Sequence, residues 1–177
     1  MARIKVRDGE TVTTETIVGA GDSLAVAVGG AIARSGGSPA VRITGANATV
    51  RNDGDISVTG ANGAALLGSF SGTLDLTIRN SGDISAQSVA VSLSSTTGTN
   101  GTVRFTNSGA INGGAGNAVA MRDLRATSIT IINAEGGVIT NAGTSDVLRP
   151  GHDLSLIHIS QLSLIHISEP TRHALLS

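Results

Sequence analysis

Acidic and basic residues that could act together in chemistry recur along one part of the sequence. Asp53, Asp55 and Asp83 lie close to Arg51 and Arg79, and Asp55 and Asp83 hold equivalent places in two related segments. Enzymes that cleave or rearrange polysaccharides use clustered carboxylates, often with calcium, and a basic residue near the reacting bond. The other interpretation is a row of hydrated charges at successive turns. We favour this second interpretation, because the chain has no Tyr or Trp to stack on sugars and only one lysine.

Other motifs that suggest chemistry are incomplete. A calcium-binding nonapeptide roll needs repeated Gly-Gly-x-Gly-x-Asp units, and residues 113–117, Gly-Gly-Ala-Gly-Asn, occur once and lack the Asp. Residues 19–21, Gly-Ala-Gly, precede no helical pattern, so a phosphate-binding loop is not expected. Ser and Thr are abundant, but residues 1–151 contain no histidine that could activate one as a nucleophile. The sequence therefore predicts no catalytic, cofactor-binding or metal-binding residues, no cofactor, and a protein that is not an enzyme.

The histidines belong to a C-terminal segment that stands apart from the rest of the chain. Residues 154–160, Leu-Ser-Leu-Ile-His-Ile-Ser, recur unchanged at 162–168, and Glu-Pro-Thr-Arg-His follows at 169–173. This segment resembles a sequencing-library adapter translated in frame at the end of a truncated DNA contig. An alternating strand repeated twice is the other interpretation. We expect residues 152–177 to be a non-native tail, and we do not count its histidines as metal ligands: they are His152, His158, His166 and His173.

The charged residues lie on a repeated unit that organises most of the chain. Its clearest copies are residues 51–56, 79–84 and 106–111, which read Arg-Asn-Asp-Gly-Asp-Ile, Arg-Asn-Ser-Gly-Asp-Ile and Thr-Asn-Ser-Gly-Ala-Ile. A looser copy ends at Ile139, and an eroded one, in which Val28 takes the place of Asn, ends at Ile32. The isoleucines that end the five copies are 24, 28, 27 and 28 residues apart. A period in this range is typical of solenoids.

Within each repeat, three short segments alternate apolar and polar residues, as half-buried strands do. Three strands per repeat predict an all-β fold, a right-handed parallel β-helix (solenoid) of about five coils over residues 24–151. Equivalent strands would pair at a spacing of about 4.8 Å along the axis. Residues 1–23 contain the turn signal Asp8-Gly9 between two strand-like segments. We interpret them as an N-terminal cap folded as a short hairpin, because the end of a stacked array exposes unpaired strand edges.

Alignment of the repeats predicts that equivalent side chains stack in ladders. One inward column contains Val26, Val50, Ile78, Phe105 and Ile131. The column beside it contains Leu24, Ala48, Leu76, Val103 and Ile129. A third contains Ile32, Ile56, Ile84, Ile111 and Ile139. A polar ladder at a corner contains Asn52, Asn80, Asn107 and Asn133. Glycines follow these asparagines and leave room for the chain to bend: they are Gly54, Gly82 and Gly109.

The composition agrees with many small layers better than with one large core. The 177 residues include no Trp, no Tyr and two Phe, so Val, Ile, Leu and Ala must fill the interior. There is no cysteine, which excludes disulfides and thiolate metal sites. The formal net charge is -1, and residues 1–151 contain 11 basic and 11 acidic residues. This balance predicts no nucleic-acid partner and no membrane contact. No apolar run approaches the roughly 20 residues of a membrane span, and no signal peptide is visible.

With these repeats, residues 24–151 resemble the passenger region of autotransporter-type adhesins and related bacterial β-strand-repeat surface proteins. The resemblance rests on the Asn-x-Gly-x-Ile units, on the Ala-Val pairs at 40–41 and 118–119, and on the closing phrase Asp-Val-Leu-Arg-Pro-Gly at 146–151. It implies a protein that is secreted or displayed on the bacterial cell surface. The chain departs from the pattern in showing neither a signal peptide nor a membrane-anchoring barrel, so we expect a truncated fragment of a longer protein.

The resemblance implies that the fragment is a β-helical stalk or adhesive scaffold. Its expected partners are host or surface glycans or proteins, and its solenoid ends could self-associate. Two alternatives remain open at this point. One is a carbohydrate-active β-helix enzyme, a lyase, hydrolase or epimerase, whose catalytic coils lie beyond the truncation. The other is a phage-type fibre module.

Overall fold

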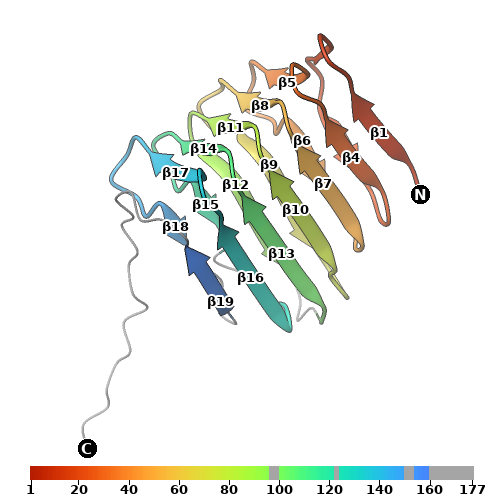
Figure 1. Cartoon of the computed structure of the whole chain (residues 1–177), viewed down its shortest axis with the longest axis vertical. Coiled ribbons are helices and arrows are strands. Elements are labelled where there is room, and N and C mark those ends of the chain that lie inside the picture. Colours follow the sequence, from red (N-terminus) through yellow and green to blue (C-terminus); the bar gives the residue numbers. More distant parts are fainter. Residues whose placement is uncertain (96–99, 122–123, 150–153, 160–177) are drawn as a thin grey trace, which may run out of the picture.

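The chain folds as a parallel β-solenoid in which three sheets run side by side along one axis (Figure 1). The structure is a computed structural model that describes residues 1–95, 100–121 and 124–149, together with the backbone of residues 154–159. Every regular element in these ranges is a strand. The predicted all-β parallel β-helix is therefore confirmed.

Each sheet collects every third strand of the chain. Sheet A contains β1 (Arg3–Val6), β4 (Ser23–Val26), β7 (Ala48–Asn52), β10 (Leu76–Asn80), β13 (Thr102–Asn107), β16 (Ser128–Asn133) and β19 (Leu154–Ile159). Sheet B contains β2 (Thr11–Val12), β5 (Ala31–Arg34), β8 (Asp55–Val58), β11 (Asp83–Ala86), β14 (Ala110–Gly113) and β17 (Val138–Asn141). Sheet C contains β3 (Thr16–Val18), β6 (Val41–Ile43), β9 (Ala64–Phe70), β12 (Val89–Ser95), β15 (Val119–Ala120) and β18 (Leu148–Arg149). Five coils thus run from β4 to β18, as predicted, and β1 to β3 form one more coil before them.

The interior is built from the inward residues of the alternating strands. In β7 and β10 every second residue is buried, and the residues between them face solvent or are half-buried. The isoleucine column is in register through all five predicted members, which stack from Ile32 to Ile139. Phe105 fills one place in the neighbouring column of sheet A and is fully buried. Apolar burial of this kind stabilises each coil only through the coils next to it.

One predicted register is wrong by two residues. Leu24 pairs with Val50, and Val26 pairs with Asn52, whereas the repeat alignment placed Val26 beside Val50. Val28, predicted at the asparagine position, is 74 % exposed in a turn. The cause is turn length, because four residues separate β4 from β5 and only two separate β7 from β8. A shift of two residues leaves every side chain on its predicted face, so the alternation could not reveal it.

The predicted N-terminal hairpin is also wrong. Residues 3–6, 11–12 and 16–18 each pair in parallel with the equivalent strand of the next coil. The turn at Asp8-Gly9 exists, since Gly9 has a φ of 73° and the Glu10 amide donates to the Arg7 carbonyl. It directs the chain from sheet A into sheet B and not back along sheet A. Residues 1–23 therefore contain a complete coil that stacks on the coil after it.

Part of the C-terminal tail, which we expect to be non-native, pairs with the solenoid. β19 lies parallel to β16, with a register shift between Ile129 and Thr130. Backbone hydrogen bonds at an open sheet edge do not depend on side-chain identity. Any segment of alternating residues can add to such an edge. The remaining tail residues lie outside the described part of the chain, and the adapter origin of the tail stays a prediction.

Candidate functional site

The repeated Asn-x-Gly unit forms the corner between sheets A and B. In the three middle coils, two residues connect the strands: 53–54, 81–82 and 108–109. In the first two coils and the last one, four residues make the same connection. The short turns require the chain to bend sharply between its last inward residue in sheet A and the first residue of sheet B. The asparagine and the glycine of each unit make this bend possible in different ways.

The asparagines form the predicted polar ladder inside the corner. The Nδ2 group of Asn52 donates to Oδ1 of Asn80 at 2.8 Å, and the same bond joins Asn80 to Asn107 and Asn107 to Asn133. Each Nδ2 group also donates to the carbonyl of the glycine that closes its own turn, at 2.7 to 3.1 Å. All four side chains are buried. Their amides therefore satisfy turn carbonyls and tie successive coils together.

The ladder ends in an unpaired acceptor at Asn52. In the described residues, Asn52 Oδ1 is buried and accepts no hydrogen bond. The residue stacked on it in the preceding coil is Val26, which is apolar and fully buried. An unpaired buried carbonyl oxygen costs stability, so this end of the ladder is not equivalent to its middle.

The glycines are required by the close approach of neighbouring coils. A Cβ atom on Gly82 would overlap the carbonyl oxygen of Gly54, and one on Gly109 would overlap that of Gly82. None of these three glycines has a positive φ. The sequence prediction that they give room for the bend is thus refined: the space they leave is occupied by the backbone of the adjacent coil.

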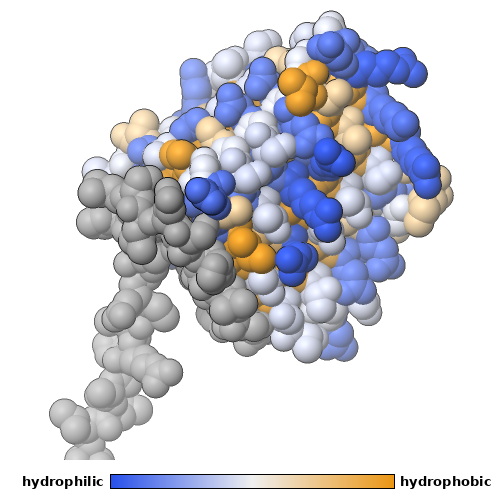
Figure 2. Space-filling view, in the orientation of Figure 1, coloured by the Kyte–Doolittle hydropathy of each residue, from blue (hydrophilic) through white to orange (hydrophobic). Residues whose placement is uncertain are grey.

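A hollow of about 330 Å³ lies on the outer side of this corner, at the edge of sheet A. Three successive coils supply two residues each from equivalent positions: Arg51 and Asp53, Arg79 and Ser81, and Thr106 and Ser108. Figure 2 shows the face on which it lies, where hydrophilic residues gather over the strands of sheet A. The hollow is an open depression and not an enclosed cavity.

The groups in the hollow are only partly engaged with one another. Arg51 Nε lies 2.7 Å from Asp53 Oδ2 in an ion pair, and the Arg51 side chain is 64 % exposed. The other oxygen of Asp53 accepts a hydrogen bond from the Ser81 hydroxyl. Arg79 stacks in register on Arg51, is exposed, and forms no ion pair within the described residues. One free guanidinium, one carboxylate and several hydroxyls can therefore bind a ligand that is both anionic and rich in hydroxyls.

The structure separates the aspartates that the sequence grouped together. Asp53 lines the hollow, but Asp55 and Asp83 do not. They begin β8 and β11, pair with each other in register, and are exposed on the outer face of sheet B. General acid–base cleavage of a glycosidic bond uses two carboxylates on either side of that bond. Among the residues that line the hollow, Asp53 is the one carboxylate.

Sequence reasoning missed the hydroxyl groups of the hollow. Ser81, Thr106 and Ser108 were part of the repeated unit, but nothing in their types marked them as ligand-binding residues. Their place in the repeat was the signal that could have identified them as lining residues of the hollow. Ser81 and Ser108 hold the position equivalent to Asp53, and Thr106 holds the position of the repeated arginine.

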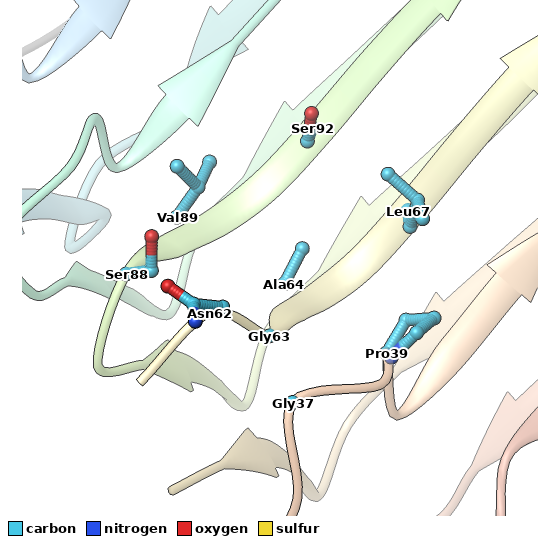
Figure 3. Close-up of a pocket in the computed structure, with 9 residues that line it drawn as sticks. All are labelled: Gly37, Pro39, Asn62, Gly63, Ala64, Leu67, Ser88, Val89 and Ser92. Carbon is cyan, nitrogen blue, oxygen red and sulfur yellow. The ribbon is translucent and has the colours of Figure 1, made fainter. Parts of the chain in front are cut away.

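A second, smaller depression of about 190 Å³ lies on sheet C (Figure 3). It is formed by residues before and within β9 and β12, including Asn62, Ala64, Leu67, Ser88 and Ser92. In Figure 3, Leu67 and Ser92 extend from neighbouring strands above the turn that carries Asn62. No charged side chain lines it. It can offer a few hydrogen bonds and a small apolar contact.

The remaining motifs form corners of the fold. Gly21, in the Gly-Ala-Gly segment, has a φ of 72° and donates its amide to the Ala46 carbonyl of the next coil. Asn117, at the end of the Gly-Gly-Ala-Gly-Asn segment, donates through Nδ2 to the Asp146 carbonyl. Across residues 1–95, 100–121 and 124–149 there is no group of three or more His, Asp or Glu that could hold a metal ion. The histidine side chains lie outside these ranges.

Comparisons with known proteins add no relative to these observations. No protein-family model, no curated protein and no solved structure matches the chain. No helix in the described part of the chain has the length and apolar character of a membrane span. The structure itself shows a parallel β-solenoid with a polar hollow beside the corner that contains the asparagine ladder.

Proposed function

We propose that this chain is part of a secreted bacterial surface protein, in which the β-helix serves as a stalk or an adhesive scaffold. The observation that carries the proposal is the uninterrupted parallel stack, in which sheets A, B and C each run through all coils without a break in strand order. Each coil contacts only its neighbours, so such a body lengthens by adding coils and keeps the same cross-section. That geometry suits a stalk that holds a binding surface away from a cell.

The chemistry of the hollow supports a scaffold in preference to an enzyme. Asp53 is its only carboxylate, and its other polar side chains are arginine, serine, threonine and asparagine. A general base and a general acid would have to come from this set, and neither Arg nor Ser serves without a partner that accepts its proton. Binding requires only the charges and hydroxyls that are present.

The exposed faces support adhesion through many weak contacts. The outward positions of the strands are rich in Ser, Thr and Asn, such as Thr49 and Thr77 in sheet A and Ser85 and Asn112 in sheet B. Single hydrogen bonds to such groups contribute little. Repetition along the solenoid axis allows several to act at once, and linked weak contacts can reach high overall affinity.

The proposal is tested by locating the protein in its source cells. Antibodies to the purified chain are applied to intact and to lysed cells, and intact cells are treated with protease before immunoblotting. We expect labelling of intact cells and loss of the band after protease treatment. Labelling that requires lysis would contradict the proposal.

Sequencing the gene past codon 151 gives an independent test of the same proposal. We expect the reading frame to continue into further coils and then into an outer-membrane anchor or a secretion signal. A catalytic insert among the following coils would instead favour the carbohydrate-active enzyme.

A further inference from the structure

Residues 1–151 contain equal numbers of basic and acidic residues, but several of these charges are separated onto different faces. The outer face of sheet A carries five cations at outward positions of its strands: Arg3, Lys5, Arg51, Arg79 and Arg104. Asp55 and Asp83 instead occupy outward positions of sheet B. Figure 2 views the sheet A face, along which hydrophilic residues run over successive strands. These cations outnumber the carboxylates at the edges of the face, Asp53 and Asp75, and an excess of cations raises the local concentration of anionic ligands.

Two arginines of this face, Arg79 and Arg104, are not neutralised by an ion pair within the described residues. Arg51 and Arg79 are direct cross-strand neighbours, about 4.8 Å apart at the backbone, and like charges in this position destabilise a sheet. Arg51 is paired with Asp53. Arg79 and Arg104 are exposed, and within the described residues neither forms an ion pair. A bound anion would relieve this repulsion.

Threonine hydroxyl groups lie beside Arg79 and Arg104 on neighbouring strands. Thr49, Thr77 and Arg104 form one in-register row across β7, β10 and β13. Two residues further along the same strands, Arg79 of β10 lies beside Thr106 of β13. Each free guanidinium therefore has hydroxyl groups as cross-strand neighbours. A ligand that fits this face has acidic groups separated by groups that donate and accept hydrogen bonds.

We infer that the outer face of sheet A binds an anionic polysaccharide whose sugars carry carboxylates. Arg79 and Arg104 bind carboxylates of the sugars, since the guanidinium fork matches a carboxylate in a bidentate pair. Asp53 and the Ser and Thr hydroxyls bind the sugar hydroxyls in and beside the hollow. This inference rests on the proposed function, because it names the class of partner that the scaffold would adhere to.

Two other polyanions fit this face less well. Single-stranded nucleic acids bind with bases stacked on aromatic side chains, whereas both phenylalanines, Phe70 and Phe105, are buried and the chain has no Trp or Tyr. An anionic membrane would require apolar residues among the cations. No exposed large apolar residue lies on a described strand of sheet A: Ile17 and Val138 are on sheets C and B, and Met1 and Val28 are outside the strands.

The experiment measures binding of the purified full chain to polygalacturonate at low and at high salt by isothermal titration calorimetry. Dextran, dextran sulfate and single-stranded DNA are the neutral, sulfated and phosphorylated comparison polymers. The test variant is Arg79→Gln, and the matched control is Arg149→Gln, which removes the same charge from the exposed end of β18 in sheet C. Melting curves from circular dichroism establish that both variants are folded.

We expect polygalacturonate to bind in preference to the other three polymers, and we expect the affinity to fall as salt screens the charges. Arg79→Gln should weaken binding about tenfold or more, which corresponds to one charge-assisted hydrogen-bonded pair, and Arg149→Gln should leave it unchanged. The inference is overturned by any of three results. These are no binding of polygalacturonate, equal weakening by the two variants, and tighter binding of DNA or dextran sulfate.

The outcomes also separate this inference from the proposed function. Binding through Arg79 by a protein that antibodies detect only in lysed cells would refute the surface role and leave the ligand class standing. A surface-exposed protein that does not bind polygalacturonate would refute the ligand class alone.

Discussion

The asparagine ladder allows a sharp comparison between two substitutions of the same kind. In the middle of the ladder, Asn80 accepts a hydrogen bond from Asn52 and donates to Asn107 Oδ1 and to the Gly82 carbonyl. At the end of the ladder, Asn52 makes the equivalent donations, but its Oδ1 is buried and unpaired within the described residues. Asn80→Ala and Asn52→Ala therefore remove the same atoms from nearly the same surroundings.

The two variants differ in the number of unpaired acceptors that they leave. Asn80→Ala keeps the unpaired oxygen of Asn52 and adds that of Asn107, whose donor is lost. Asn52→Ala creates an unpaired oxygen on Asn80 but removes its own, so the number does not change. The turn carbonyls stay paired in both variants, because Gly54 O also accepts from the Asp83 amide and Gly82 O from the Ala110 amide.

The difference in the free energy of unfolding should therefore equal the cost of one buried unpaired acceptor, about 1–3 kcal/mol. Cavity terms largely cancel, because both side chains are buried and truncated to Ala. We expect Asn80→Ala to be the less stable variant. For a chain of this size, a difference of about 2 kcal/mol lowers the melting temperature by roughly 4–8 °C.

Denaturant titration followed by far-ultraviolet circular dichroism measures this difference, since a chain without Trp or Tyr lacks the usual fluorescence signal. Asn62→Ala, which truncates an exposed asparagine outside the ladder, is the control and should change the midpoint little. The slopes of the transitions must agree between variants, because coils of a solenoid can unfold separately. Equal losses at Asn52 and Asn80, or a larger loss at Asn52, would refute the argument from unpaired acceptors.

Three further substitutions and one deletion test the packing of the coils. Gly82→Ala should lower the melting temperature clearly, because its Cβ atom would overlap the Gly54 carbonyl; an unchanged melting temperature would show that neighbouring coils can move apart at this corner. Ile84→Asp places a charge at a fully buried position and should abolish cooperative unfolding, since total stabilities are only about 5–15 kcal/mol. Asp83→Ala, at an exposed neighbouring position, should be nearly neutral in the same melting experiment, and the reverse order would mean that the register is off by one residue. A chain that ends at Gly151 loses β19, whose pairing with β16 is interrupted by a register shift, and should melt within about 4 °C of the full chain; loss of the folding transition would make the tail an essential cap.

The sequence by itself determined that this protein is a parallel β-helix. The alternation of apolar and polar residues sets the strands and their buried faces locally, and a period of 24 to 28 residues requires equivalent strands to stack. The isoleucine column and the asparagine ladder followed from the same repeat, and both are in register in the structure. These features depend on residue type and spacing alone.

The register of one strand, the fold of the first coil and the placement of the charges depended on the tertiary structure and could not be read from residue spacing. The pairing of Leu24 with Val50 depended on the length of one turn, and a shift of two residues does not alter the alternation. Residues 1–23 formed a coil and not a hairpin because β1 pairs with the next coil at its side. The sequence showed a balance of charges but not their positions in space. Only the winding of the chain brought Arg51, Arg79 and Arg104 onto one face and Asp55 and Asp83 onto another, because residues about 27 positions apart become neighbours when equivalent strands stack in register.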